Sequence, residues 1–260
     1  MNNLLQAVVL GVIEGVSEFL PISSTGHLLI AEHWLGARSE LFNVAIQAGA
    51  ILAALLVFWP RVAALLRGFG QRENRSYLGK LLLAFAITVA GGFAAKQLGL
   101  ALPDTVAPVA GALIIGGVLM LGIEWLIAAR AVSAAASWPV AVAVGCSQLL
   151  AAIFPGTSRS AATIFGAMLA GMTSRPAATE FAFLVGIPTM FAATTYEFLK
   201  LLGAGTVAED WTALIVAFVV ATLVAYVAVR WLLRYLQTHR FTVFAWYRIA
   251  LGIALLAIAR

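Results

Sequence analysis

Apolar stretches long enough to cross a membrane recur along nearly the whole chain. A membrane-spanning helix needs about 20 mostly apolar residues. Six stretches qualify, namely 41–59, 80–98, 107–127, 177–199, 211–233 and 243–259. Hydrophobic residues make up 63% of the sequence and charged residues 10%, whereas a soluble domain averages about 45–50% and about 25%. The sequence therefore predicts one all-α integral membrane domain over residues 1–260, and it excludes a soluble globule, a disordered chain and a disulfide-rich secreted module.

Two further apolar regions, 3–35 and 138–172, are each interrupted by a polar turn. The interruptions are 20–27 (LPISSTGH) and 154–160 (FPGTSRS). Non-helical backbone is tolerated at membrane depth only where it is buried in protein or lines a watery cavity. The sequence therefore predicts two re-entrant helical hairpins in addition to the six spans. The alternative of two kinked spans is disfavoured because these regions carry Glu, His and Arg as well as Pro.

The distribution of Lys and Arg predicts the orientation of the chain. Loop 60–80 carries five basic residues and one acidic residue, and the segments 128–138, 171–176 and 230–242 also carry arginine. Basic loops stay in the cytoplasm, so the first hairpin is predicted to enter from outside and the second from inside. The net charge of +5 has the same explanation and does not indicate a nucleic-acid partner.

The two hairpins are related by an internal repeat. A shift of 134 residues pairs Gly11 with Gly145, Pro21 with Pro155, and Ser24 with Ser158. Because the hairpins enter from opposite sides, the repeat is inverted, with residues 1–127 as the first copy and 138–260 as the second. Inverted repeats with broken helices place a binding site near the membrane midplane.

Two carboxylates share one face of the first helix. Gly11, Glu14, Gly15 and Glu18 have the spacing i, i+3, i+4, i+7, which aligns them along the helix. Buried carboxylates need a cation, and divalent cations prefer carboxylate oxygens, so Glu14 and Glu18 are the predicted metal ligands. A water-filled vestibule and a proton relay are the alternatives. The two glycines allow another backbone to approach closely.

The first turn combines hydroxyl groups with an imidazole. Amide groups at the start of the next helix favour an anion, so Ser23 and Thr25 are predicted to bind phosphate. His27 follows Ser24 by three residues, which is close enough for proton exchange with a hydroxyl or a leaving group. Ser24 and His27 are therefore predicted to be catalytic, and Ser24 either attacks phosphorus or positions a water. A lone histidine would more often be structural.

The second turn adds an arginine to a similar set of hydroxyls. A guanidinium at membrane depth needs an anion, and phosphate matches its donor fork. Arg159, Thr157 and Ser158 are therefore predicted to bind phosphate. The alternative is that Arg159 only ties the hairpins together by binding Glu14 or Glu18. The combined pattern favours phosphoryl transfer, with the predicted catalytic residues Glu18, Ser24, His27 and Arg159.

Segments 14–27 (EGVSEFLPISSTGH) and 155–160 (PGTSRS) closely resemble the two signature motifs of the undecaprenyl-diphosphate phosphatase, or bacitracin-resistance, family. The resemblance extends over essentially the whole chain in length, repeat and span pattern. Ala161 stands where the family usually has glycine, which should affect hairpin packing only slightly. The family's functional positions carry over onto Glu14, Glu18, Ser23, Ser24, Thr25, His27, Ser158 and Arg159.

This resemblance implies a multi-pass hydrolase of the bacterial inner membrane. Its reaction would convert undecaprenyl diphosphate to undecaprenyl phosphate and phosphate, which recycles the lipid carrier for peptidoglycan synthesis and gives bacitracin resistance. The resemblance also implies a divalent cation, Mg²⁺ or Ca²⁺, and a homodimer. With the loop charges, it predicts an active site that opens to the periplasm.

A transport function is the alternative from another class. Inverted repeats with broken helices are typical of transporters, so the chain could instead move a polyprenyl phosphate across the bilayer. Phosphate release from a lipid diphosphate in detergent, where no membrane sides exist, separates the two hypotheses.

Overall fold

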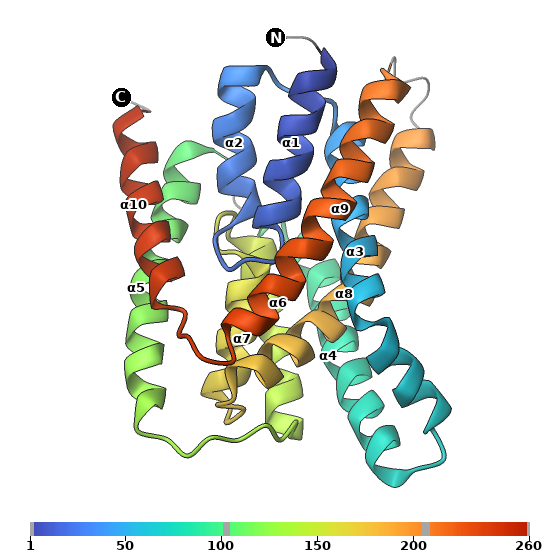
Figure 1. The fold of residues 1–260 in the computed structure, drawn as a ribbon, viewed down its shortest axis with the longest axis vertical. Helices are drawn as coiled ribbons and strands as arrows, with labels where there is room; N and C mark the ends of the chain where they lie inside the picture. The colour runs from blue at the N-terminus through green and yellow to red at the C-terminus, as the bar shows by residue number, and fades with distance from the viewer. Residues whose placement is uncertain (1–2, 101–104, 204–208, 259–260) are drawn as a thin grey trace.

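The fold of the chain is given by a computed structural model, which describes residues 3–100, 105–203 and 209–258 (Figure 1). These residues form helices and no strand. The helices are α1 (Asn3–Ser17), α2 (Ser24–Leu35), α3 (Glu40–Arg67), α4 (Arg72–Gln97), α5 (Val106–Ala128), α6 (Trp138–Ile153), α7 (Arg159–Leu169), α8 (Arg175–Gly203), α9 (Trp211–Tyr235) and α10 (Thr242–Ile258).

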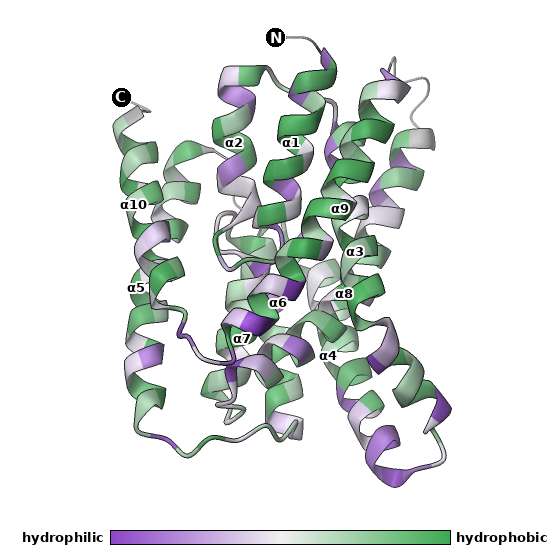
Figure 2. Ribbon diagram, in the orientation of Figure 1, coloured by the Kyte–Doolittle hydropathy of each residue, from purple (hydrophilic) through white to green (hydrophobic). Residues whose placement is uncertain are grey.

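Five of the helices in the described residues, α3, α4, α5, α8 and α9, are long and apolar enough to cross a membrane. Helix α10, with 17 residues, corresponds to the predicted span 243–259. The last residue of that span lies outside the described residues. Large apolar side chains such as Phe93, Leu223 and Val227 are more than 60% exposed on these helices, and Figure 2 shows hydrophobic residues along most of their length. The prediction of an all-α membrane protein is confirmed.

Helices α3 and α4 are longer than the predicted spans 41–59 and 80–98. Helix α3 continues through Pro60 to Arg67 before α4 begins at Arg72. An internal proline removes one backbone hydrogen bond, and helices of membrane proteins tolerate this loss. The result is a helical hairpin that projects beyond the other helices at the lower right of Figure 1, and it carries most of the basic loop 60–80.

The two interrupted regions form helical hairpins: the first covers the predicted 3–35, and the second begins at 138 as predicted but ends at Leu169 instead of 172. Helices α1 and α2 are joined by a turn after Ser17, and helices α6 and α7 by a turn after Ile153. Both turns lie near the middle of the molecule (Figure 1). The α1–α2 hairpin opens toward the end where the chain begins, and the α6–α7 hairpin opens toward the opposite end.

Each hairpin packs against a long helix that lies far away in the sequence. Helix α1 packs along α9, and α6 packs along α4. Glycines permit these contacts, because a Cβ at Gly11 would lie 2.7 Å from the Ala217 carbonyl oxygen and one at Gly145 would lie 2.9 Å from that of Ala84. The close backbone approach expected at Gly11 is confirmed. Helices α5 and α10 form another closely packed pair, and α3 contacts both α8 and α9.

Candidate functional site

The two predicted metal-binding carboxylates lie at the end of α1. Helix α1 ends at Ser17, and the N–H of Glu18 donates to the Glu14 carbonyl oxygen at 3.0 Å, so Glu18 begins the turn. Glu14 is 2% exposed and Glu18 is 8% exposed. Glu14 Oε2 has no hydrogen-bond partner among the described residues, although a buried carboxylate oxygen normally has one.

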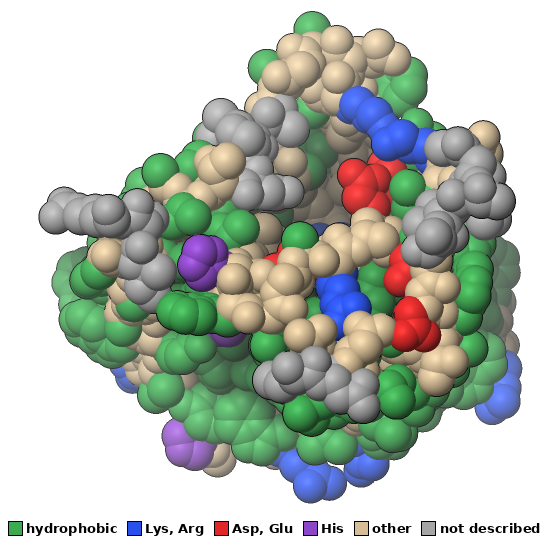
Figure 3. Space-filling view, turned by 90° about the horizontal axis from the view of Figure 1, so that it is seen from above, with side chains coloured by type: hydrophobic (Ala, Val, Ile, Leu, Met, Phe, Trp, Pro, Cys, Tyr) green, Lys and Arg blue, Asp and Glu red, His purple; other side chains and the backbone are tan. Residues whose placement is uncertain are grey.

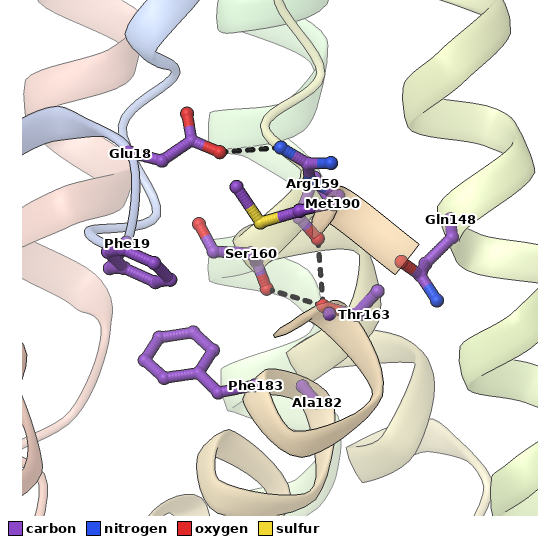
Figure 4. Close-up of a pocket in the computed structure, with 10 residues that line it drawn as sticks. Glu18, Phe19, Gln148, Arg159, Ser160, Thr163, Ala182, Phe183 and Met190 are labelled. Carbon is purple, nitrogen blue, oxygen red and sulfur yellow. Dashed lines mark hydrogen bonds and ion pairs between the residues drawn. The ribbon is translucent and has the colours of Figure 1, made fainter. Parts of the chain in front are cut away.

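Glu18 connects the two turns. Its Oε2 accepts a hydrogen bond from Ser24 Oγ at 2.6 Å, and its Oε1 accepts one from Arg159 Nη2 at 2.5 Å. Figure 4 shows the Glu18–Arg159 contact between the first turn and the start of α7. A second link joins the turns where Ser160 Oγ donates to the Leu20 carbonyl oxygen at 3.1 Å. The structure therefore brings together three of the four predicted catalytic residues, Glu18, Ser24 and Arg159.

Ser23 and Ser158 are the N-cap residues of α2 and α7. Their hydroxyls accept hydrogen bonds from Gly26 N and Ala161 N, each at 3.3 Å. Their φ angles are 72° and 66°, and no other non-glycine residue in the described parts of the chain has a positive φ. Such backbone persists only where the surroundings enforce it. As N-caps, Ser23 and Ser158 are the structurally equivalent residues of the two turns. In the turns the shift between the repeats is therefore 135 residues instead of 134, and Ser24 corresponds to Arg159.

His27 contacts a residue of α10 instead of the Ser24 hydroxyl. Its Nδ1 lies 2.7 Å from the Ser23 carbonyl oxygen, and its Nε2 lies 2.6 Å from the Tyr247 hydroxyl, with the two rings stacked. A carbonyl oxygen can only accept, so Nδ1 carries the proton of the neutral ring and Nε2 accepts from the Tyr247 O–H.

The remaining predicted phosphate-binding hydroxyls, those of Thr25 and Thr157, are partly buried and make no hydrogen bond to other described residues. The Thr157 backbone is engaged, since its N–H donates to the Phe154 carbonyl oxygen at 3.2 Å. Both hydroxyls are thus free to bind a ligand.

A small cavity lies beside the Glu18–Arg159 contact. Its volume is about 20 Å³, which is room for about one water molecule. Its lining comes from the first turn, α6, α7 and α8, and includes Gln148, Thr163 and Phe183 (Figure 4). Gln148 donates from Nε2 to Thr88 Oγ1 at 3.0 Å, while its buried Oε1 has no partner among the described residues.

The end of the molecule toward which the α1–α2 hairpin opens carries a hollow. Figure 3 shows acidic and basic side chains around this hollow, whereas mostly hydrophobic side chains lie toward the rim of the view.

Four polar residues inside predicted spans or at their ends were missed as structural or functional groups. Tyr247 and Arg248 are neighbours on α10, and Arg248 is 0% exposed. Glu124 on α5 accepts from Arg175 Nε at 2.8 Å and from Phe241 N at 3.0 Å, away from the two turns. A charge inside a membrane span suggests a function by itself, and this signal was available for Arg248.

The comparisons agree with the motifs. The family model of bacitracin resistance protein BacA matches residues 7–254. Among similar curated proteins, one from Rhizobium etli (strain CIAT 652) is 57% identical over 98% of this chain and 97% of its own length. Another, from Xanthomonas oryzae pv. oryzae (strain PXO99A), is 53% identical over 98% of this chain and 97% of its own length. Both are named undecaprenyl-diphosphatase. Helical fold, paired turns and full-length similarity together place this chain in the BacA family of bacitracin resistance proteins.

Proposed function

We propose that this protein hydrolyses undecaprenyl diphosphate to undecaprenyl phosphate and phosphate. This reaction recycles the lipid carrier for peptidoglycan synthesis and gives bacitracin resistance. The observation that carries the proposal is the pair of contacts by which Glu18 binds both Ser24 and Arg159. Relatives named for this activity cover nearly the full chain, and their name does not favour the alternative of a flippase.

Ser24 is the nucleophile in this proposal. As its Oγ attacks the terminal phosphorus, its proton passes to Glu18 Oε2, which already accepts the hydrogen bond. The bond from that phosphorus to the bridging oxygen breaks, and undecaprenyl phosphate leaves. Glu18 then releases the Ser24 proton to solvent and is ionised again. A water molecule attacks the phosphoserine and gives a proton to Glu18, and Glu18 returns this proton to Ser24 Oγ as the bond from phosphorus to Oγ breaks, so phosphate departs and the Ser24 hydroxyl is restored.

His27 serves the leaving oxygen. Nδ1 is committed to the Ser23 carbonyl, so Nε2 is the atom that faces this oxygen. Nε2 of the neutral ring has no proton to give, so it first takes one from solvent to form the imidazolium and then passes it to the bridging oxygen as the bond to phosphorus breaks. The Tyr247 hydroxyl holds Nε2 in place until substrate binds. Tyr247 therefore joins the site as a residue that orients the imidazole.

The second turn binds the phosphate. Arg159 uses Nη2 to contact Glu18, and the remaining N–H groups of its fork match a phosphate. The hydroxyls of Thr25 and Thr157 complete the set from both turns. Ser23 and Ser158 contribute chiefly through the backbone at the helix starts that they cap.

The cofactor in this proposal is a divalent cation, Mg²⁺ or Ca²⁺. No group of three or more His, Cys, Asp or Glu residues suited to a metal occurs in the described residues. Mg²⁺ commonly binds through one or two carboxylates together with water and substrate phosphates, and the unpartnered Glu14 Oε2 fits this mode. Glu14 and Glu18 would hold the cation, which when bound supplies positive charge for the phosphate oxygens.

The membrane arrangement in this proposal has six spans and two re-entrant hairpins. Residues 1–127 and 138–260 form the inverted repeats, and the site opens to the periplasm from the bacterial inner membrane. The support is that the hairpins open toward opposite ends, while the basic loops gather at the end away from the chain start (Figure 1). A homodimer, implied by the family resemblance, stays a prediction that native mass measurement in detergent can check.

Phosphate release by the purified protein in detergent tests the function. We expect release from undecaprenyl diphosphate, its loss on addition of EDTA, and its return with Mg²⁺ or Ca²⁺. The Ser24→Ala variant is the matched control for a contaminating phosphatase. Folded, metal-supplied protein that releases no phosphate would refute the proposed function, whatever its effect on lipid movement in vesicles.

A further inference from the structure

Arg248 is a fully buried cation without an acidic partner. It is 0% exposed, and no carboxylate among the described residues lies within salt-bridge distance of it. An unpaired charge inside an apolar bundle is costly. The side chain therefore has to be compensated by other groups.

Backbone carbonyls supply that compensation. Arg248 Nη1 donates to the carbonyl oxygens of Thr157 at 2.9 Å and Pro21 at 3.5 Å. Nη2 donates to those of Ala112 at 3.0 Å and Gly156 at 3.2 Å. Nε donates to that of Leu113 at 3.5 Å. A guanidinium has five N–H groups, so each has an acceptor.

Three of the five acceptors lie on the two turns, Pro21 on the first and Gly156 and Thr157 on the second, and the other two lie on α5. Pro21 precedes the cap Ser23 by two residues, and Thr157 directly precedes the cap Ser158. Since a trans peptide points its C=O and N–H in opposite directions, a Thr157 carbonyl held on Arg248 turns the Ser158 N–H away from Arg248. Both caps have the positive φ that needs support from the surroundings.

The neighbouring backbone leaves space for this side chain. A Cβ at Gly116 on α5 would lie 2.9 Å from Arg248 Cζ. A Cβ at Gly122 on the same helix would meet no atom within 4 Å. Glycine at 116 thus makes room for the guanidinium itself.

We propose that Arg248 is a positioning residue, which fixes the two N-cap turns relative to each other so that both face one phosphate. The proposal rests on the proposed phosphatase function. Arg248 touches no reacting atom, and its guanidinium acts through backbone carbonyls, which tie the two turns to each other and to α5.

The direct variant is Arg248→Lys, which keeps the charge but offers three donors instead of five. We expect kcat per folded molecule to fall about 10- to 100-fold, the loss that a displacement of about 1 Å can cause. Arg248→Gln should lose more, because it removes the charge and most donors. A merely structural role would lower the thermal midpoint and leave kcat per folded molecule unchanged.

A gentler pair of variants covers the case in which Arg248→Lys does not fold. Gly116→Ala pushes the guanidinium from its place while Arg248 remains, and Gly122→Ala adds the same methyl group to the same helix in open space. Hydrogen exchange by mass spectrometry in detergent would be measured for peptides that contain residues 19–27 and 154–161. We expect faster exchange in both peptides, and a kcat about 10-fold lower, for Gly116→Ala but not for Gly122→Ala.

The outcomes separate the two proposals. If the unsubstituted protein releases no phosphate but Gly116→Ala loosens both turns, the function fails and the positioning role stands. If the unsubstituted protein is active while Gly116→Ala matches Gly122→Ala in exchange and kcat, the positioning role is refuted. Loosening of one turn alone would also refute it, since the proposal requires Arg248 to hold both.

Discussion

Glu18 and Arg159 are 141 positions apart in the sequence, yet Arg159 Nη2 lies 2.5 Å from Glu18 Oε1. The Glu18 side chain is 4% exposed and that of Arg159 is 28% exposed. The contact therefore joins the two turns within the site. A phosphate that binds the remaining N–H groups of Arg159 lies next to this carboxylate, which couples substrate binding to the position of Glu18.

Replacing Arg159 should separate binding of phosphate from support of the hairpins. Arg159→Lys keeps the charge but loses the planar fork, so turnover should fall, and Arg159→Ala should reduce it further, by about 30- to 1000-fold. The measurement is kcat on folded, membrane-inserted variants. Near-normal turnover of Arg159→Ala would mean that the second hairpin is only a scaffold.

Glu14 and Glu18 should differ in their response to metal. Glu14→Gln keeps the shape of the side chain, and Glu14 Oε2 has no hydrogen-bond partner to lose among the described residues. The fold should therefore persist while the Mg²⁺ concentration for half-maximal activity rises. Glu18→Gln should remove most activity at any metal concentration, since it also weakens the contacts to Ser24 and Arg159. Full activity of Glu18→Gln at unchanged metal concentration would contradict both roles of this residue.

The Tyr247 hydroxyl is predicted to act through His27. Tyr247→Phe keeps the stacked ring and removes the O–H that donates to His27 Nε2. We expect kcat to fall about tenfold, below the range of about 10²–10⁴ for loss of a general acid or base, with KM nearly unchanged. Tyr226→Phe is the control, because its hydroxyl hydrogen-bonds only with Arg230 of the same helix α9 among the described residues, in an exposed contact. Equal kcat values for the two variants would exclude an orienting role.

Cysteine labelling tests the sidedness of the chain. In a background with Cys146, which is exposed, replaced by alanine, a cysteine at Ser39 should react with an impermeant thiol reagent in intact cells. A cysteine at Asn74, in the first turn of α4 within the basic segment 60–80, should react only after the membrane is opened. The reverse pattern would invert the topology and place the site on the cytoplasmic side.

The interruptions and the hairpin boundaries could be predicted because proline, glycine and hydroxyl residues act on the backbone locally. The regions 3–35 and 138–172 begin where α1 and α6 begin, and both turns lie where the motifs lie. The approach of another backbone at Gly11 was predictable for the same reason, since a missing side chain leaves space wherever the helix packs.

The partners of His27 and Arg248 could not be predicted in this way. Tyr247 is 220 positions from His27, and no local pattern relates them. The acceptors of Arg248 are backbone carbonyls, which every residue possesses and which therefore leave no trace in the sequence. The continuation of α3 past Pro60 depends on helix context, which a proline alone does not reveal.

The packing of α1 along α9 has a consequence for the order of events on the ribosome. The first hairpin leaves the ribosome long before α9, the helix that covers it, because about 175 residues separate α2 from α9. Contacts between such distant segments form late and slowly. The nascent hairpin, with two carboxylates and a strained turn, therefore lacks its α9 partner until late in translation, so the site can be completed only after α9 has been made.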